Sequence, residues 1–401
     1  MSTRDYDLVV YGATGFTGRQ AAATIQRSGG DLRWCIAGRN QGKLEALRDE
    51  LGLGQLPIEV ADALDEDAIS ALVARTRVLL TTAGPYAKYG ESLIAACARH
   101  GTDYVDITGE TPWVRDMMDR YHDTAVSTGA VIVPFCGFDS VPSDIGAWFM
   151  VQQLRERGTG TALVRAVHRS KGGFNGGTLA TAMNLAETGM DRRMRDRRLL
   201  DPPETRDGPK LRADPRTVEY SDELGRWTVP FFMGPVNSRV VRRSAALSSL
   251  WDAPYGEGFD YEERMGLGKS GLGARTFTLG LGLSLSLMGA AWGRSLLRPM
   301  LPKPGEGPSE ETMDGGFMKV DLFAEGEDGT NLQGRLTAKG DPGNRVTVAL
   351  LCACALILVH QRDALPGGPD RVGFLTPATA FGQVLVDRMR ADGMTLELTE
   401  R

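Results

Sequence analysis

The sequence has no excess of basic residues and no paired cysteine motif. Its 46 lysines and arginines stand against 51 acidic residues, so the 401-residue chain has a formal net charge of −5. Nucleic-acid-binding proteins normally carry a basic surface, so nucleic acid is not an expected partner. The five cysteines show no CxxC spacing and form no paired metal-ligand motif with the histidines. Neither a metal site nor a disulfide framework is expected.

A secretion signal is also lacking at the start of the sequence. The first residues, MSTRDYDLVVYG, are charged and lead directly into an apolar strand, whereas a signal peptide would continue into a hydrophobic segment. We therefore expect a reduced, cytoplasmic setting. A length of 401 residues is enough for two domains, because single cores rarely grow past about 250–300 residues.

A glycine-rich motif follows the first predicted strand, in YDLVVYGATGFTGRQAAATIQRSG. Glycines at 12, 15 and 18 let the backbone turn sharply, approach a pyrophosphate closely and pack the next helix on the strand. Free N–H groups at the start of that helix then bind phosphate. The motif predicts a dinucleotide site; its alternative is an ordinary tight turn. The predicted cofactor-binding residues of this loop are Gly12, Thr14, Gly15, Phe16, Thr17 and Gly18.

The end of the second predicted strand distinguishes the two nicotinamide cofactors. An NAD-dependent enzyme tends to place Asp or Glu there, where the carboxylate binds the ribose 2′-hydroxyl. This sequence has Arg39, with Lys43 one turn later, and a guanidinium suits a 2′-phosphate. We predict NADPH; the alternative is a pair of solvated cations on a loop.

Later strand ends complete the predicted cofactor site. Asp62 follows the third strand, where it would meet the adenine ring, and Thr82, Gly84 and Pro85 follow the fourth. Ligands of open α/β sheets lie outside the carboxyl ends of the strands, so the latter three should border the nicotinamide. Two more strands are predicted in TDYVDITGE and GAVIVPFCGFDSVPSDIG. The alternation predicts a doubly wound parallel sheet of the Rossmann type over residues 1–136.

Two other reductase chemistries find no support in the sequence. Short-chain reductases use a Tyr-x-x-x-Lys pair, but Tyr86, Tyr89, Tyr104 and Tyr121 have no lysine at that interval. A thiol nucleophile needs an activated cysteine with a histidine partner. Cys136 is the candidate by position, and its alternative role is that of a small buried hydrophobe.

The motifs GATGFTGR, AGRN, TAGPY…YG and GFDSVPSDIG together resemble those of the saccharopine-dehydrogenase-like oxidoreductases. LPKPGEGPSEE (301–311) and GFLTPATAFGQVLVDRM (373–389) resemble their trans-acting enoyl reductase branch, so the resemblance covers the whole chain. It implies a Rossmann domain, a mixed α/β second domain over 137–401 and NADPH as hydride donor, with 376–401 packing back on the first domain. It also implies reduction of an acyl double bond on a polyketide synthase that makes long-chain lipids.

Reducing an α,β-unsaturated thioester requires a hydride at the β-carbon, polarisation of the carbonyl group and a proton for the α-carbon. The candidate catalytic residues are Tyr86, Asp139 and Ser140. Tyr86 is a proton donor or, alternatively, packs over the nicotinamide. Asp139 and Ser140 are candidates for contact with substrate, whereas Ser143 and Asp144 stand where residues cap a helix.

Two alternative functions remain for such a sequence. One is a reductase of the same superfamily that acts on an amino acid or imine, which would need an acidic and a basic clamp in a polar pocket. The other is a non-catalytic, NADPH-binding, membrane-associated scaffold. Comparing NADPH turnover with acyl-thioester and amino-acid substrates distinguishes the first alternative from an enoyl reductase. The scaffold would bind NADPH but show no hydride transfer to any acyl acceptor.

The second half of the chain is predicted to be mixed. A strand, a glycine-rich turn and a helix from about Thr178 are expected first, with a second anion site or a plain cap at that helix start. Residues 318–341 predict two antiparallel strands, 344–360 an apolar helix, and Thr376-Pro377 the start of a last helix. Strands with long hydrophobic faces often build a dimer interface, so a homodimer is one expectation.

A run of arginines lies between residues 192 and 198. A charge run is usually a solvated face. The alternative is a docking surface for an acyl carrier, whose acidic surface and phosphopantetheine phosphate would suit such cations. The span 200–216, rich in proline and charge, predicts a mobile loop.

The stretch TFTLGLGLSLSLMGAAWG (276–293) has no charged residue. A membrane-spanning helix needs about 20 apolar residues, and this stretch is shorter and interrupted by glycine. We predict a helix that continues into RSLLRPML, in preference to a strand with every second leucine on one face. Three placements follow: a buried core element, an apolar surface in peripheral contact with lipid, or the wall of a channel for an acyl chain.

Overall fold

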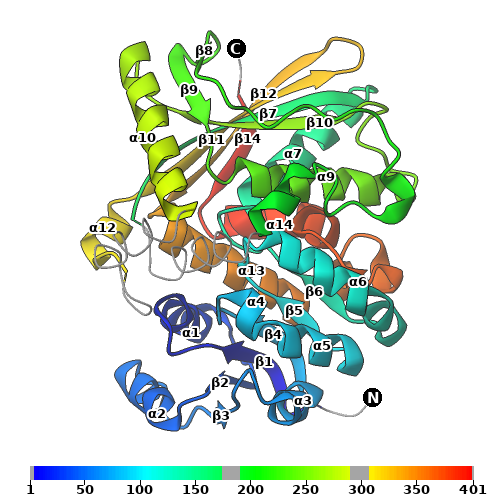
Figure 1. Cartoon of the computed structure of the whole chain (residues 1–401). Coiled ribbons are helices and arrows are strands. Elements are labelled where there is room, and N and C mark those ends of the chain that lie inside the picture. The colour runs from blue at the N-terminus through cyan, green and yellow to red at the C-terminus, as the bar shows by residue number, and fades with distance from the viewer. Residues whose placement is uncertain (1–3, 174–189, 290–306, 400–401) are drawn as a thin grey trace.

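The computed structural model describes residues 4–173, 190–289 and 307–399. Two seven-stranded sheets form the framework (Figure 1). The strands of sheet A are β1 (Tyr6–Tyr11), β2 (Trp34–Gly38), β3 (Ile58–Val60), β4 (Thr76–Thr81), β5 (Asp103–Val105), β6 (Val131–Val133) and β13 (Gly373–Phe374). Their order is β13-β6-β5-β4-β1-β2-β3, and every pairing is parallel. The predicted parallel sheet is confirmed.

Helices cover both faces of sheet A. They are α1 (Phe16–Ser28), α2 (Gln41–Glu50), α3 (Glu66–Ala74), α4 (Tyr86–Tyr89), α5 (Glu91–His100), α6 (Thr111–Thr128) and, from the far end of the chain, α13 (Thr347–His360). Leu8 and Val10 of β1 face the core that contains α1 and α13, while Val9 faces the core under α3, α5 and α6. A strand buried on both faces explains the continuous apolar run LVV.

Sheet B is mixed. Its strands are β7 (Thr161–Lys171), β8 (Glu219–Ser221), β9 (Arg226–Pro230), β10 (Asp260–Gly266), β11 (Phe317–Gly326), β12 (Asn331–Lys339) and β14 (Thr395–Leu398). The order is β14-β12-β11-β7-β10-β9-β8, with β7 and β10 parallel and the other neighbours antiparallel. The hairpin predicted over 318–341 is confirmed as β11 and β12.

The remaining helices connect the two sheets or flank sheet B. They are α7 (Val141–Arg155), α9 (Gly234–Leu250), α10 (Gly271–Gly289), α12 (Glu310–Asp314) and α14 (Pro377–Ala391). Helices α7 and α14 lie between the sheets, and α7 packs on β7, β11 and β12 (Figure 1). The predicted last helix is confirmed as α14, which Thr376 caps. The helix predicted from Thr178 lies outside the described residues.

Segments near the carboxyl end contribute to both layers. Helix α13 packs on α1 and β4, and β13 extends sheet A, whereas β14 extends sheet B. In the described ranges, one helix is long and apolar enough to cross a membrane, Pro342–His360 with a mean hydropathy of 1.8. Since 83% of that window is buried inside the fold, it is a core helix.

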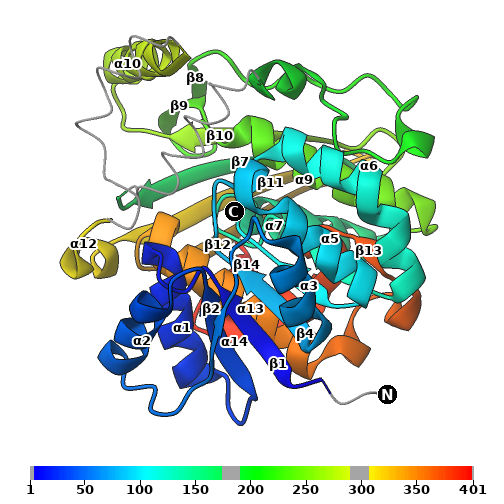
Figure 2. The same cartoon turned by 60° about the horizontal axis from the view of Figure 1, so that its bottom comes forward.

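Helix α10 contains the described part of the uncharged stretch. The predicted helix is confirmed for 276–289, and 290–293 lie outside the described residues. The helix stands beside β8 and β9, at that edge of sheet B (Figures 1 and 2). Leu279 and Leu283 are exposed. The core placement is therefore wrong for these leucines, because no layer covers them within the described fold.

Candidate functional site

The glycine-rich loop forms a close-packed turn between β1 and α1. Gly12 has φ = +77°, and a Cβ added there would lie 3.1 Å from the Ala83 nitrogen. A Cβ at Gly18 would lie 2.2 Å from the Gly12 carbonyl oxygen, so α1 packs against the turn with no room for a side chain. Gly15 precedes α1 without a side-chain cap. The first N–H groups of α1 are thus oriented to bind phosphate, as a dinucleotide requires.

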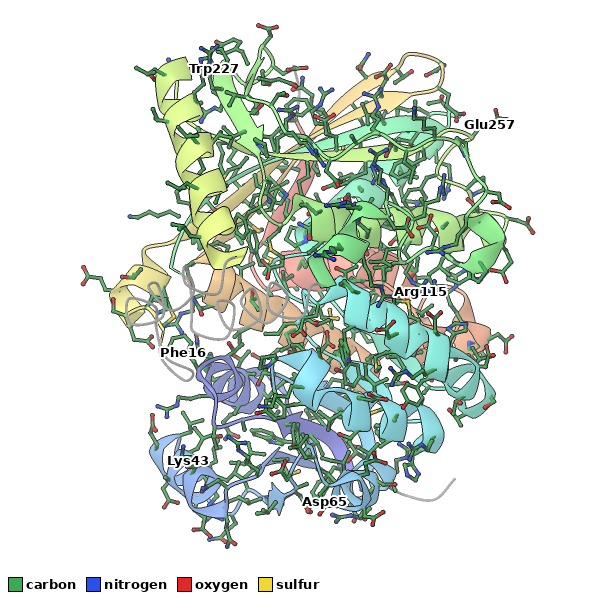
Figure 3. All side chains as sticks on the ribbon, viewed as in Figure 1. Phe16, Lys43, Asp65, Arg115, Trp227 and Glu257 are labelled. Atoms are coloured by element: carbon green, nitrogen blue, oxygen red, sulfur yellow. The ribbon has the colours of Figure 1, made fainter. Side chains whose placement is uncertain are left out.

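Phe16 extends the loop toward the second half of the chain. A Cβ added at Gly307 would lie 2.4 Å from its ring, so Gly307 lies directly on the ring (Phe16 is labelled in Figure 3). Arg345 donates to Gln20 of α1 at 2.8 Å and pairs with Asp314 at 2.9 Å. These contacts place the GPSEE segment beside the glycine loop. Thr14 and Thr17 are half-buried in the same turn.

Exposed cations border the outer end of this loop. Arg39 follows β2 and Lys43 lies on α2. Both side chains are exposed and have no ion-pair partner among the residues the structure describes. Asp62 is exposed two residues after β3, and its carboxylate accepts the Leu64 N–H at 3.0 Å. An uncapped helix start with two unpaired cations fits a dinucleotide that carries a 2′-phosphate.

We expect Arg39→Gln to raise the Kd of NADPH by about tenfold or more, because hydrogen bonds to charged groups contribute about 1.5–3 kcal/mol. The Kd of NADH should stay unchanged, since NADH has no 2′-phosphate. Fluorescence titration of each cofactor measures both constants. Arg27→Gln, at the opposite end of α1, is the matched control and should change neither. An equal loss for both cofactors would contradict the assignment.

The loop after β4 is tied to the glycine loop and to β5. The Thr82 hydroxyl donates to the Gly12 carbonyl at 3.3 Å. Gly84 is exposed, and Pro85 directly precedes α4. The buried Glu110 carboxylate accepts the N–H groups of Tyr86 and Ala87, at 2.6 and 2.9 Å. Glu110 therefore fixes the start of α4. Sequence reasoning did not assign it a role, although it follows β5 at the same sheet edge.

Tyr86 is held inside the fold. Its hydroxyl donates to the Thr81 carbonyl at 3.2 Å and accepts the Ile107 N–H at 3.4 Å. Burial raises the pKa of the Tyr86 hydroxyl well above its ordinary value, and its ring lies 5.9 Å from that of Trp113. These contacts are those of a structural residue inside the fold; both the proton-donor role and packing over the nicotinamide stay predictions. Cys136 is also buried, and burial raises the pKa of its thiol, as suits a hydrophobe.

Polar residues after β6 face the second half of the chain. The Ser140 hydroxyl is buried and donates to Asn237 Oδ1 of α9 at 3.1 Å. Asp144 accepts the hydroxyl of Ser244 and the Ala378 N–H, the latter at 2.8 Å. Asp144 thus caps α14, whereas the sequence pointed to a cap for its own helix. Burial raises the pKa of Asp144 to about 7.

Asp139 lies in the same loop as Ser140 but, unlike Ser140 and Asp144, it is not held by a hydrogen bond to another part of the described fold. Its side chain is half-buried, and its carboxylate has no hydrogen-bond partner within residues 4–173, 190–289 and 307–399. Burial raises the pKa of Asp139 to about 6; the negative charge of Glu263 adds to the rise and His168 opposes it. A carboxyl group of this kind is partly protonated near neutral pH and can deliver a proton.

A buried acid–imidazole cluster, formed by Ser143, His168, Tyr261 and Glu263, lies behind Asp139. His168 Nε2 contacts Glu263 Oε1, which also accepts the hydroxyls of Ser143 at 2.6 Å and Tyr261 at 3.3 Å. The Phe231 ring stacks on the imidazole at 4.5 Å. His168 Nδ1 and Glu263 Oε2 have no hydrogen-bond partner among described atoms. The sequence did not reveal this cluster, since His168 and Glu263 lie on separate strands.

Within the described residues, two of the five arginines between residues 192 and 198 form ion pairs. Arg193 pairs with Asp116 at 2.9 Å and Arg198 with Asp201 at 3.0 Å, which fits a solvated face. A cavity of about 420 Å³ opens beside it, with Arg242 and Asp260 in its wall. No residue before 198 lines that cavity, so it is separate from the carboxyl edge of sheet A. Docking of an acyl carrier on the run stays a prediction.

Comparison with known proteins agrees with this geometry. Residues 8–133 match the saccharopine dehydrogenase NADP binding domain. A trans-acting enoyl reductase of Mycobacterium bovis is 36% identical over 425 residues, which cover 99% of this chain and 98% of that protein. A Mycobacterium tuberculosis protein that carries the same name provisionally is 39% identical over 416 residues, with the same coverage. The yeast (Saccharomyces cerevisiae) saccharopine dehydrogenase (L-Glu forming) superposes with a TM-score of 0.56 at 13% identity, over 99% of each chain.

Proposed function

The chain belongs to the family of the trans-acting enoyl reductases, and from this premise we propose that it uses NADPH to reduce the carbon–carbon double bond of an α,β-unsaturated acyl thioester. It is an NADP-dependent oxidoreductase. One observation carries the proposal. The cradle for an NADP-type cofactor and the unpartnered carboxyl group of Asp139 lie at the same edge of sheet A, after β1, β4 and β6.

Different residues at this edge of sheet A bind different parts of NADPH. The loop 12–18 and the start of α1 hold the pyrophosphate, and Arg39 with Lys43 holds the 2′-phosphate. Glu110 fixes α4, and this keeps the Thr82–Pro85 loop beside the nicotinamide position. When bound, NADPH supplies the hydride that joins the β-carbon of the substrate.

Asp139 then supplies the proton that the α-carbon needs. Hydride addition to the β-carbon moves the π-electron pair of the double bond onto the α-carbon and the thioester carbonyl. Transfer of the carboxyl proton of Asp139 to the α-carbon completes the saturated acyl chain, and a proton from water restores the acid. Ser140 and Tyr86 position their loops, because each hydroxyl is already bonded inside the protein.

Burial is the main cause of the raised pKa of Asp139 and Glu263 adds to it, so Glu263→Gln should shift the pH dependence of kcat. Removing the negative charge of Glu263 lowers the pKa of Asp139, and the acid form is then lost at lower pH. The falling limb of kcat should move to lower pH. Glu262→Gln is the matched control, because Glu262 pairs with Arg264 at 2.6 Å and lies outside the cluster; its profile should match the wild type. If the pH at which kcat falls were the same in Glu263→Gln as in wild type, the cluster would have no part in catalysis.

We further propose that the acyl substrate is lipid-like and is presented by a separate polyketide synthase; the name of the relatives, trans-acting enoyl reductase, fits an enzyme that acts on a substrate held by another protein. Arg192 and Arg195 are exposed and have no acidic partner in the described part of the chain, so they are available to a phosphopantetheine phosphate. The homodimer and the cytoplasmic setting remain predictions.

NADPH oxidation measured at saturating cofactor tests the function directly. We expect turnover with 2-enoyl N-acetylcysteamine thioesters and none with a cyclic imine or with an aldehyde plus glutamate, which together form an imine. Turnover with the imines alone would overturn the assignment in favour of an amine-forming reductase. Tight NADPH binding with no turnover on any thioester would favour a scaffold.

A further inference from the structure

Helix α10 presents leucines to solvent on its outer side. Leu272, Leu279 and Leu283 are 75%, 76% and 62% exposed. At about 100° per residue, these positions fall within about 40° of one another around the helix axis. We name them the leucine ridge.

The ridge points away from the protein. Ala274, which is 1% exposed, lies about 140° or more around the helix from each ridge position. A Cβ added at Gly271 would lie 2.8 Å from the Trp227 indole of β9, so the start of the helix packs on sheet B at about 80–120° around the helix axis from the ridge (Trp227 is labelled in Figure 3). Phe277 is 43% exposed but lies about 120–160° around the helix axis from the ridge, so it is not part of the ridge. An ordinary surface helix turns its apolar side chains toward the core, whereas α10 exposes its ridge leucines to solvent.

The charge on α10 and on the chain next to it in sequence has one sign. Arg275 is the charged residue of α10 and is exposed, and the exposed Lys269 precedes the helix. No Asp or Glu occurs in the sequence between Glu263 and Glu306, although the whole chain carries a net charge of −5. A helix with exposed leucines and only basic charges in its own segment suits an anionic lipid surface.

A second copy of the chain fits the ridge less well. Stable protein interfaces bury about 800 Å² on each partner and use roughly 20–30 residues a side. The ridge forms a narrow line on one projecting helix and cannot supply that area. A bilayer accepts such a line, because its interface is deformable and apolar just below the phosphates.

We propose that α10 docks the protein on an anionic phospholipid bilayer, with the leucine ridge among the acyl chains and Arg275 and Lys269 at the lipid phosphates. The helix lies in the interface and does not span the membrane. Docking there does not depend on the reductase activity, because no residue of α10 belongs to the proposed cofactor or proton-transfer site.

Co-sedimentation of the full chain with vesicles tests the docking. Wild type should bind vesicles of phosphatidylcholine with 30% phosphatidylglycerol at least tenfold more strongly than vesicles of phosphatidylcholine alone. Leu279→Glu/Leu283→Glu should lower binding to the anionic vesicles at least tenfold while NADPH affinity is kept, which shows that the variant is folded. Leu64→Glu/Leu250→Glu adds the same charge at exposed leucines away from α10 and should bind as wild type does.

Three results would overturn the proposal. Wild type could fail to bind either vesicle, or the ridge variant could bind as well as wild type. The third is a dimer in wild type that light scattering shows to become a monomer in the ridge variant, with vesicle binding absent; the ridge would then join two copies of the chain.

Discussion

Gly18→Ala is expected to weaken NADPH binding by at least about tenfold and to lower the free energy of unfolding by about 1–3 kcal/mol. The added Cβ would lie 2.2 Å from the Gly12 carbonyl oxygen and 2.9 Å from the Ala13 Cα. Both neighbours are backbone atoms, so α1 must move away from β1. The N–H groups at the start of α1 would then leave the pyrophosphate position. Cofactor titration and chemical denaturation measure the two effects.

Gly42→Ala is the control for this variant. Gly42 lies in α2, where the nearest atom to an added Cβ is Asn40 Oδ1 at 3.8 Å. Alanine is favoured over glycine in a helix by about 1 kcal/mol, so this control should be as stable as wild type or more so. If Gly18→Ala bound NADPH as tightly as Gly42→Ala does, the close packing of α1 on the loop would have no part in cofactor binding.

Asp139→Asn is expected to lower kcat by about 10²–10⁴-fold, the usual contribution of a general acid. The amide keeps the size of the carboxyl group but holds no proton that it can donate. In the wild type, kcat should fall as pH rises through about 6, because the pKa of Asp139 is raised to about 6 and the acid form is lost above it. The residual activity of the Asn variant should lack this limb. Stopped-flow and steady-state assays across pH measure both features.

Ser140→Ala separates Asp139 from its neighbour. The Ser140 hydroxyl bonds to Asn237 inside the fold, so its removal should lower stability by about 1–3 kcal/mol, the cost of a buried unsatisfied group, and leave kcat within a few-fold of wild type. If Ser140→Ala lost as much kcat as Asp139→Asn while Asp139→Asn kept its pH limb, the acid would lie elsewhere.

Local patterns account for the parts of the site that the sequence predicted. The glycine loop and Arg39 lie within one strand–turn–helix unit and the strand that follows, so their geometry depends on short-range sequence. Residues that meet through the fold were not predicted. Glu110 binds α4 across a loop, Asp144 caps a helix that starts more than 200 residues later, and His168 meets Glu263 from a neighbouring strand. Sequence spacing carries no signal for such pairs.

The uncharged stretch 276–293 was also predicted only in part. Its helical form follows from the local sequence, and the structure confirms it in α10. The exposure of its leucines could not be predicted from the local sequence, because apolar residues normally lie inside a protein. Whether another layer covers a helix depends on the whole topology. Here α10 lies beyond the β9–β8 edge of sheet B, with no further layer outside it in the described fold.

Deuterium tracing of the reduced product tests the central claim most directly. We expect the product from a 2-enoyl thioester and NADPH deuterated at C4 of the nicotinamide, on the transferred face, to carry one deuterium at the β-carbon. With unlabelled NADPH in D₂O, one deuterium should appear at the α-carbon. Mass spectrometry and NMR locate the label. Deuterium on the carbonyl carbon, or no transfer from the nicotinamide to the acyl chain, would contradict the account.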